Sequence, residues 1–205
     1  MTHNFPKIKE FHITPIAVVD PPLLNAAGLH APYALRTVVE LVTEDNISGI
    51  SEIPGNIAID QALEKSKPFI IGQDPFQLNS IKDVLLANFD SEDTLKRGDS
   101  PWDQRTIVHI FSAIEVACMD IIGKVTNRPI VDLLGGKRRD AVPFSAYLFY
   151  KYEGAGGKLE FGTDPAATGW AKARQASALN PDEIVAQAEA MCKEFGFKSI
   201  KLKGG

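Results

Sequence analysis

The feature that most constrains the fold of this chain is the order of predicted elements after residue 140. Residues 142–149 (VPFSAYLF) predict a buried strand, and residues 199–203 alternate as a second strand. A helix lies between them, so the segment predicts a βαβ unit, whose strands are parallel and right-handed in connection. One such unit cannot cover both faces of its own strands, so we expect it to be the first part of a larger domain.

The helix between these strands has clear boundary signals. Asn180 can cap its first turn, Pro181 suits the first helical position and Glu183 completes a capping box. Gly196 is expected to end the helix. Residues 150–179 precede it and read as a long loop, and loops of this length are often part of active sites.

The second strand carries two lysines, Lys201 and Lys203, at alternate positions. Side chains on a strand alternate between faces, so we expect both lysines on one face and Ile200 with Leu202 on the other. Adjacent ammonium groups on a buried strand disfavour each other's charged form, which lowers both pKa values and allows a lysine to act as a general base. The alternative is an edge strand with two solvated lysines.

The first part of the chain predicts an α+β arrangement. We expect strands at residues 8–19, 35–43 and 47–53, with residues 20–34 as a loop, followed by helices near 57–66 and 76–88. The strongest helix is expected at 104–123, with Asp103 as its cap. Its buried face recurs at helical spacing and comprises Ile107, Phe111, Ile114, Cys118 and Ile121. We place a domain boundary after the basic turn, giving domains at 1–139 and 140–205.

Composition excludes several classes of function. The net charge of −4 argues against a general nucleic-acid binder, which needs a basic surface. We find no signal segment and no run long enough to span a membrane, so we expect a cytoplasmic protein without a membrane partner. The two cysteines, Cys118 and Cys192, lie in apolar helical patterns, and their spacing does not indicate a zinc site.

The order of these parts resembles the enolase superfamily, in which an α+β capping domain precedes a (β/α) barrel. The helix-and-linker segment from Ser112 to Lys124, followed by Leu133-Leu134-Gly135-Gly136, carries this resemblance. Four shorter stretches are similar to the glucarate dehydratases of that superfamily. They are Gly28-Leu29-His30-Ala31-Pro32, Glu52-Ile53-Pro54-Gly55, Tyr147-Leu148-Phe149 and the terminal run FKSIKLKGG.

The resemblance implies a hydro-lyase that acts on a small-molecule sugar diacid and uses Mg²⁺, and we expect a homo-oligomer. Lys203 matches the base that removes the proton beside a carboxylate, and Lys201 matches the neighbour that contacts this carboxylate. His30 and Tyr147 match substrate-binding residues. At the place of a substrate-contacting threonine the chain has Pro101, which offers no hydroxyl.

The resemblance also implies that the metal ligands lie on later barrel strands, so we expect none in this chain and place them beyond Gly205. A complete barrel is typically about 250 residues, and residues 140–205 supply only its first part, so we expect the chain alone to be inactive. Two alternatives remain: another acid-sugar dehydratase or epimerase of the same superfamily, or a non-catalytic truncated partner chain.

Overall fold

The computed structural model describes residues 5–25, 28–30, 33–93, 106–156 and 161–203. The chain forms two compact units, which are treated separately below. The first unit comprises Met1–Ile16 and Leu35–Arg138, and the second comprises Ala17–Ala34 and Arg139–Gly205. The chain therefore passes from one unit to the other three times, at residues 16–17, 34–35 and 138–139.

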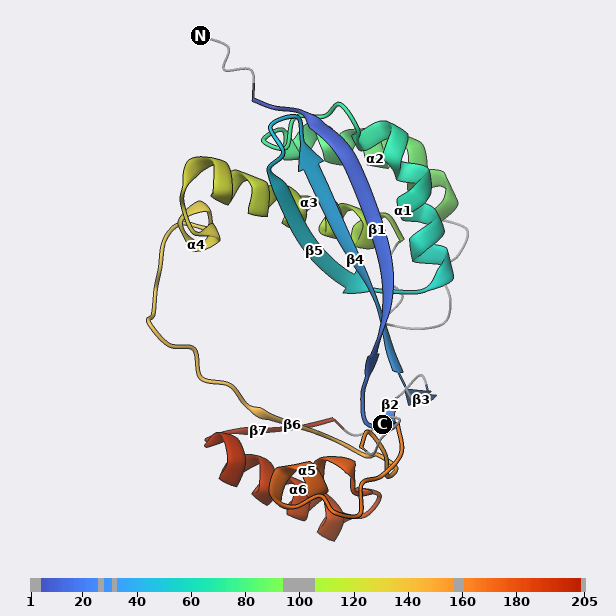
Figure 1. Cartoon of the computed structure of the whole chain (residues 1–205), viewed down its shortest axis with the longest axis vertical. Helices are drawn as coiled ribbons and strands as arrows, with labels where there is room; N and C mark the ends of the chain where they lie inside the picture. The colour runs from blue at the N-terminus through green and yellow to red at the C-terminus, as the bar shows by residue number, and fades with distance from the viewer. Residues whose placement is uncertain (1–4, 26–27, 31–32, 94–105, 157–160, 204–205) are drawn as a thin grey trace. The chain divides into compact units, whose positions relative to one another are not determined.

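The first unit is built on a three-stranded sheet with the order β1-β4-β5. The strands are β1 (Ile8–Val19), β4 (Tyr33–Thr43) and β5 (Ser48–Pro54), and β4 pairs with β5 in antiparallel fashion. Three long helices follow: α1 (Ile57–Ile70), α2 (Leu78–Asp93) and α3 (Thr106–Thr126). Figure 1 shows the three helices on one face of this sheet. The predicted order of three strands and then helices is confirmed.

The core of this unit lies between the sheet and α3. The inner face of β4 buries Val39 and Leu41, and α3 buries most of the face that its apolar spacing predicts, although Phe111 is only partly buried. By length and composition α3 could also cross a membrane, which the sequence prediction missed. Its buried residues nevertheless pack against the sheet and α1. They are Ile107, Ile110, Ala113, Ile114, Ala117, Cys118, Ile121, Ile122 and Gly123.

Strand β5 and helix α3 approach each other closely. A Cβ atom at Gly49 would lie 2.0 Å from the carbonyl oxygen of Ala117, so only glycine fits there. The Ser51 hydroxyl donates a hydrogen bond of 2.6 Å to the carbonyl oxygen of Ala113 on the helix. At the end of the contact, Asp120 accepts from the backbone N–H of Ile50 at 3.0 Å. The two elements are thus joined by polar contacts as well as by apolar packing.

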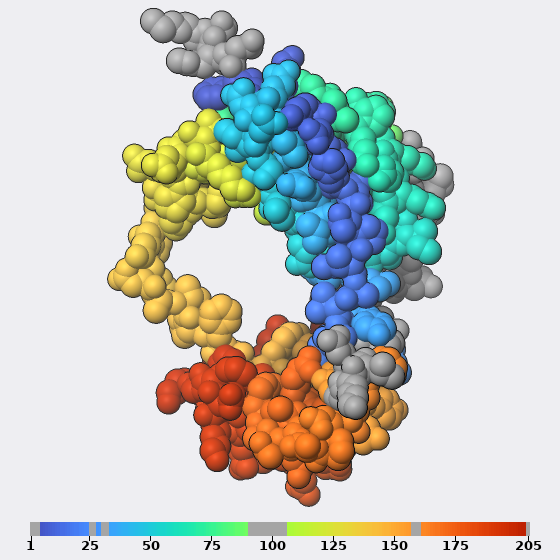
Figure 2. Space-filling model, in the orientation of Figure 1, coloured from blue at the N-terminus to red at the C-terminus, as the bar shows by residue number. Residues whose placement is uncertain are grey.

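The second unit contains a parallel strand pair and the helix that joins it. The strands are β6 (Ala146–Phe149) and β7 (Ile200–Lys203), and α6 (Pro181–Phe195) lies between them in sequence. The side chain of Asn180 accepts from the backbone N–H of Glu183 at 3.0 Å, and the Glu183 carboxylate accepts from the backbone N–H of Leu179. Gly196 ends the helix with a φ of 69°. The caps predicted at Asn180 and Gly196 and the parallel pairing are confirmed, whereas the Glu183 carboxylate bonds to the backbone N–H of Leu179 and not, as in the predicted box, to that of the cap residue. Figure 2 shows these segments packed together, in colours from gold through orange to red.

Two segments of the second unit differ from the prediction. Residues 20–34, expected as a loop, contain the short antiparallel strands β2 (Leu23–Asn25) and β3 (Gly28–His30). The long segment before α6 contains a further helix, α5 (Gly169–Gln175). The sequence assigned residues 17–34 to the first domain, but this segment is hydrogen-bonded to residues 150–152 and so groups with the second unit. The short helix α4 (Ile130–Leu133) closes the first unit.

Candidate functional site

The two lysines of β7 lie beside aromatic side chains of β6. The parallel register pairs Tyr147 with Lys201 and Phe149 with Lys203, which places all four side chains on one face. The Lys201 Nζ is 4.7 Å from the centroid of the Tyr147 ring, and the Lys203 Nζ is 5.5 Å from that of Phe149. Cations this close to the face of a ring are attracted by its quadrupole. The rings therefore hold both ammonium groups on the same surface.

This face is opposite to the one that α6 covers. Leu148 is buried and packs with Ala178 and Ile184, so the even-numbered positions of β6 face the helix. By register, Ile200 and Leu202 share that face, as the alternation predicts. They are nevertheless 52% and 58% exposed, because among the described residues β7 pairs only with β6 and the helix packs over β6. The structure thus supports the predicted side of the lysines, while their roles stay predictions.

His30 is the last residue of β3, and its backbone pairs with Leu23 across the β2–β3 hairpin. The hairpin is joined to the chain that follows β6. The backbone N–H of Leu24 donates to the carbonyl oxygen of Tyr150 at 2.7 Å, and that of Tyr152 donates to Pro22 at 3.0 Å. Strand β2, which pairs with the strand of His30, therefore runs beside the residues that follow the carboxyl end of β6. Pro101 and the terminal pair 204–205 lie outside the described residues.

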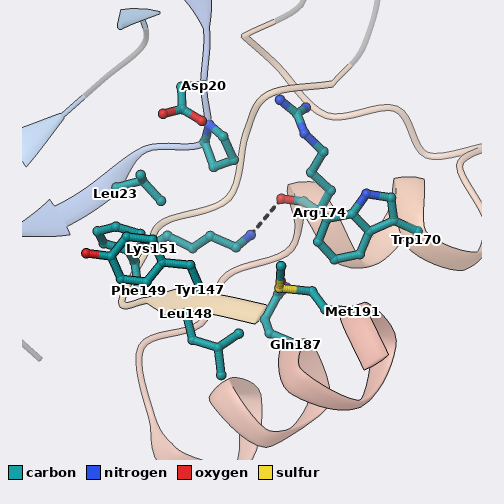
Figure 3. A pocket seen from close by; sticks show the side chains of 11 residues that line it. Asp20, Leu23, Tyr147, Leu148, Phe149, Lys151, Trp170, Arg174, Gln187 and Met191 are labelled. Atoms are coloured by element: carbon teal, nitrogen blue, oxygen red, sulfur yellow. Dashed lines mark hydrogen bonds between the residues drawn. The ribbon is translucent and has the colours of Figure 1, made fainter. Parts of the chain in front are cut away.

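A cavity of about 350 Å³ opens beside this end of β6, within the second unit. Figure 3 shows the Lys151 side chain running across it toward α5. Aromatic, apolar and charged groups all contribute to its wall. The lining residues are Asp20, Pro21, Leu23, Tyr147, Leu148, Phe149, Lys151, Trp170, Arg174, Gln187 and Met191.

Lys151 is the residue of this cavity that the sequence reading missed. Lys151 is only 5% exposed, and its Nζ donates to the carbonyl oxygen of Arg174 at 2.7 Å and to that of Ala176. Burial, and to a smaller extent the Arg174 guanidinium, lowers the pKa of Lys151 to about 8. The available signal was the alternation of Tyr147, Phe149 and Lys151. The assignment of residues 150–179 to a loop hid it.

A bound metal ion would need several ligand side chains close together. Within the part of the chain that the structure describes, no three His, Cys, Asp or Glu side chains are grouped so that they could hold a metal ion. The described site therefore offers two cations and aromatic surface, which suit an anionic substrate, but no ligand set for a divalent cation.

Comparison with known protein families gives one clear match. The N-terminal domain of the mandelate racemase / muconate lactonizing enzyme family matches residues 22–135. Among curated proteins, a probable glucarate dehydratase from Streptomyces coelicolor is 37% identical over 97% of this chain and 46% of its own length. A D-galactonate dehydratase family member from Enterococcus gallinarum is 32% identical over 57% of this chain and 25% of its own length.

The fold also matches solved structures. An enolase structure from Pseudomonas fluorescens, with bound magnesium, potassium and tartrate, aligns with a TM-score of 0.78 at 37% identity. The alignment covers 97% of this chain and 45% of that one. Nearly the whole of this chain therefore aligns with these relatives, but it spans only about half of their length.

Proposed function

This chain belongs to the mandelate racemase / muconate lactonizing enzyme family of the enolase superfamily, and we propose that it forms the N-terminal part of a Mg²⁺-dependent acid-sugar dehydratase that acts on a sugar diacid such as glucarate. The observation that carries the proposal is the shared face of Lys201, Lys203 and Tyr147 on two parallel strands. Similarity to a probable glucarate dehydratase over nearly the whole chain supports the same substrate class.

In the proposed reaction, Lys203 in its neutral form removes the proton beside a carboxylate of the substrate. Lys201 binds that carboxylate, and its charge favours the neutral form of Lys203. Tyr147 positions both ammonium groups through its ring, and His30 contacts the substrate from the β2–β3 hairpin. The hydroxyl on the next carbon then leaves with a proton as water, and the resulting enol becomes a keto acid.

The described residues include no group of three His, Cys, Asp or Glu side chains that could hold Mg²⁺. When bound in such enzymes, Mg²⁺ supplies positive charge that stabilises an enediolate. We propose that its ligands come from residues beyond Gly205 of a longer protein. A homo-oligomer is also proposed, and light scattering of the purified full-length protein tests it.

The test is incubation of the full-length protein with Mg²⁺ and a panel of acid sugars, including glucarate and galactonate. Formation of a 2-keto-3-deoxy acid, detected by its reaction with semicarbazide, is the expected result. The second candidate, an epimerase of the same family, would invert a carbon without loss of water, which NMR of the product distinguishes. Absence of both reactions with every substrate would favour a non-catalytic partner chain.

A further inference from the structure

Lys151 lies where three segments of the second unit meet. Its backbone N–H donates to the carbonyl oxygen of Ala178 at 3.1 Å and its own carbonyl accepts from the N–H of Ala178 at 2.9 Å. On its other side it forms an antiparallel bridge with Leu23, and the flanking bonds at Leu24 and Tyr152 extend this pairing. Residue 151 therefore lies between Ala178 on one side and β2 on the other, and β2 pairs in turn with β3.

The side chain of Lys151 makes the third connection. Helix α5 ends at Gln175, and the last carbonyls of a helix have no partner within it and carry partial negative charge. The Lys151 Nζ donates to one of them, that of Arg174 (Figure 3), and to the carbonyl oxygen of the C-cap residue Ala176, which follows the helix. These two bonds account for a buried ammonium group that has no carboxylate partner among the described residues, because the end of the helix supplies the opposite charge.

The end of α5 in turn holds the chain that follows β6. The carbonyl oxygen of Gln175 accepts from the backbone N–H of Gly154 at 2.9 Å. The Arg174 guanidinium donates to the carbonyl oxygen of Ala155 at 2.5 Å. Residues 174–176 therefore hold residues 151–155 through backbone and side-chain hydrogen bonds. The Lys151 side chain in turn donates to carbonyl oxygens of the same three-residue segment.

We propose that Lys151 is a positioning residue for substrate binding. It caps α5 and so keeps residues 150–152 in place against β2, which sets the position of the β2–β3 hairpin and of His30 relative to the face of Tyr147, Lys201 and Lys203. This inference rests on the proposed function of that face. Lys151 acts through the hairpin and does not itself touch the reacting atoms.

The experiment compares Lys151→Met with Lys193→Met in the full-length protein. Methionine keeps an unbranched apolar stem but cannot donate to the two carbonyls, and Lys193 is an exposed lysine in the last turn of α6. For Lys151→Met we expect KM for the acid sugar to rise about tenfold while kcat changes less than twofold, since misplacing a binding group weakens ground-state and transition-state binding alike. Lys193→Met should leave both constants unchanged, and Lys151→Arg should restore part of the loss.

A double-mutant cycle identifies the route of the effect. If Lys151 acts through the hairpin, its loss should matter less in a His30→Ala background than in the wild type, because the group it positions is already gone. Fully additive effects on kcat/KM would overturn the proposal. So would a lowered Tm with unchanged KM, which is the result expected of a residue that only stabilises the fold.

Amide hydrogen exchange provides a measurement that needs no turnover. The amides of Leu24 and Tyr152 should exchange at least about tenfold faster in Lys151→Met, while that of Thr43, hydrogen-bonded in the other unit, should not change. Faster exchange in a protein that dehydrates no acid sugar would overturn the proposed function and leave the hold on the hairpin intact. Unchanged exchange would overturn the inference itself. If Lys151→Met does not fold, Lys151→Gln replaces it, and failure of both to fold would show a general structural role and overturn the inference.

Discussion

The two lysines of β7 differ in their surroundings, and this difference supports different roles. Lys203 is partly buried, and its Nζ lies within 6.0 Å of the Tyr147 centroid as well as near Phe149. Lys201 is exposed and lies over the Tyr147 ring. The more enclosed Lys203 is the better candidate for the base, and the more exposed Lys201 can reach a carboxylate.

The first prediction concerns Lys203 in the full-length protein. Lys203→Ala should abolish dehydration and also the exchange of the substrate proton on the face that Lys203 serves, because the base is gone. Lys203→Arg should not restore either, since a guanidinium stays protonated at any working pH. Incubation with acid sugar and Mg²⁺ in D₂O, followed by NMR, measures both. Exchange at the wild-type rate in Lys203→Ala would show that another group is the base.

The companion change, Lys201→Ala, should weaken substrate binding and move the limb of the rate profile that rises with pH. That limb reports the deprotonation of the base, and loss of a neighbouring positive charge favours the protonated form of a base, so the rate should reach its plateau at higher pH than in the wild type. The measurement is kcat/KM as a function of pH for both proteins. Unaltered KM together with an unaltered profile would be inconsistent with any contact between Lys201 and the substrate.

Lys151 gives a prediction about stability and pH. Its pKa in the folded chain is about 8, below its ordinary value of 10.5, so between these pH values the unfolded chain binds more protons than the folded one. The free energy of unfolding should therefore rise with pH across this window. The rise should be absent in Lys151→Met, and urea unfolding at several pH values between 7.5 and 10 measures it. Parallel curves for wild type and variant would contradict the low pKa.

Among the elements, the contact between β5 and α3 is the most sensitive to added volume. In Gly49→Ala the new methyl group would meet the carbonyl oxygen of Ala117 and, at 2.8 Å, the Ile121 side chain. Neither backbone nor buried side chain can move away easily, so we expect the free energy of unfolding to fall by at least about 2 kcal/mol. Urea unfolding of Gly162→Ala, where the nearest atom is 3.8 Å away, is the matched control. Equal stability of the two variants would refute the close approach.

The elements that the sequence predicted are those with their own periodicity or capping signals. The alternation of β4 and β5, the apolar spacing of α3 and the capping residues Asn180 and Gly196 each act locally, so they can be recognised without tertiary structure. The strands β2 and β3 have three residues each and are formed by pairing with each other and with residues 150–152. Helix α5 has seven residues and begins at a glycine, so neither its length nor its residues gave a signal.

The same distinction applies to the candidate site. The shared face of Lys201 and Lys203 follows from alternation along one strand, so the sequence alone could predict it. The role of Lys151 depends on carbonyls of residues 174 and 176 and on a strand from residues 23–25, all distant in sequence. No local sequence pattern indicates that these distant segments contact Lys151, so the site could be predicted only in part.

For the whole molecule, we predict that residues 1–205 alone neither dehydrate acid sugars nor bind Mg²⁺ tightly. The described residues offer no metal-ligand group, and the apolar side chains of Ile200 and Leu202 are exposed on β7. Calorimetric titration with Mg²⁺ and the keto-acid assay, each beside the full-length protein as control, measure the two properties. Turnover of glucarate by the isolated chain would refute the prediction and would place the catalytic machinery within these residues.

Residues 17–34 belong to the second unit, although the segments on both sides of them in the sequence belong to the first. This arrangement has a consequence for synthesis on the ribosome. The partners of Leu24 and Pro22, at residues 150 and 152, are translated more than a hundred residues later. At about 5–20 residues per second, the hairpin segment must wait roughly 6–25 s before its partners emerge. The first unit can bury its own core during that interval, whereas the edge of β2 that faces away from β3 presents unpaired backbone groups throughout it. A nascent chain is therefore most vulnerable to aberrant pairing and to proteases in a segment near its beginning, long after that segment has left the exit tunnel.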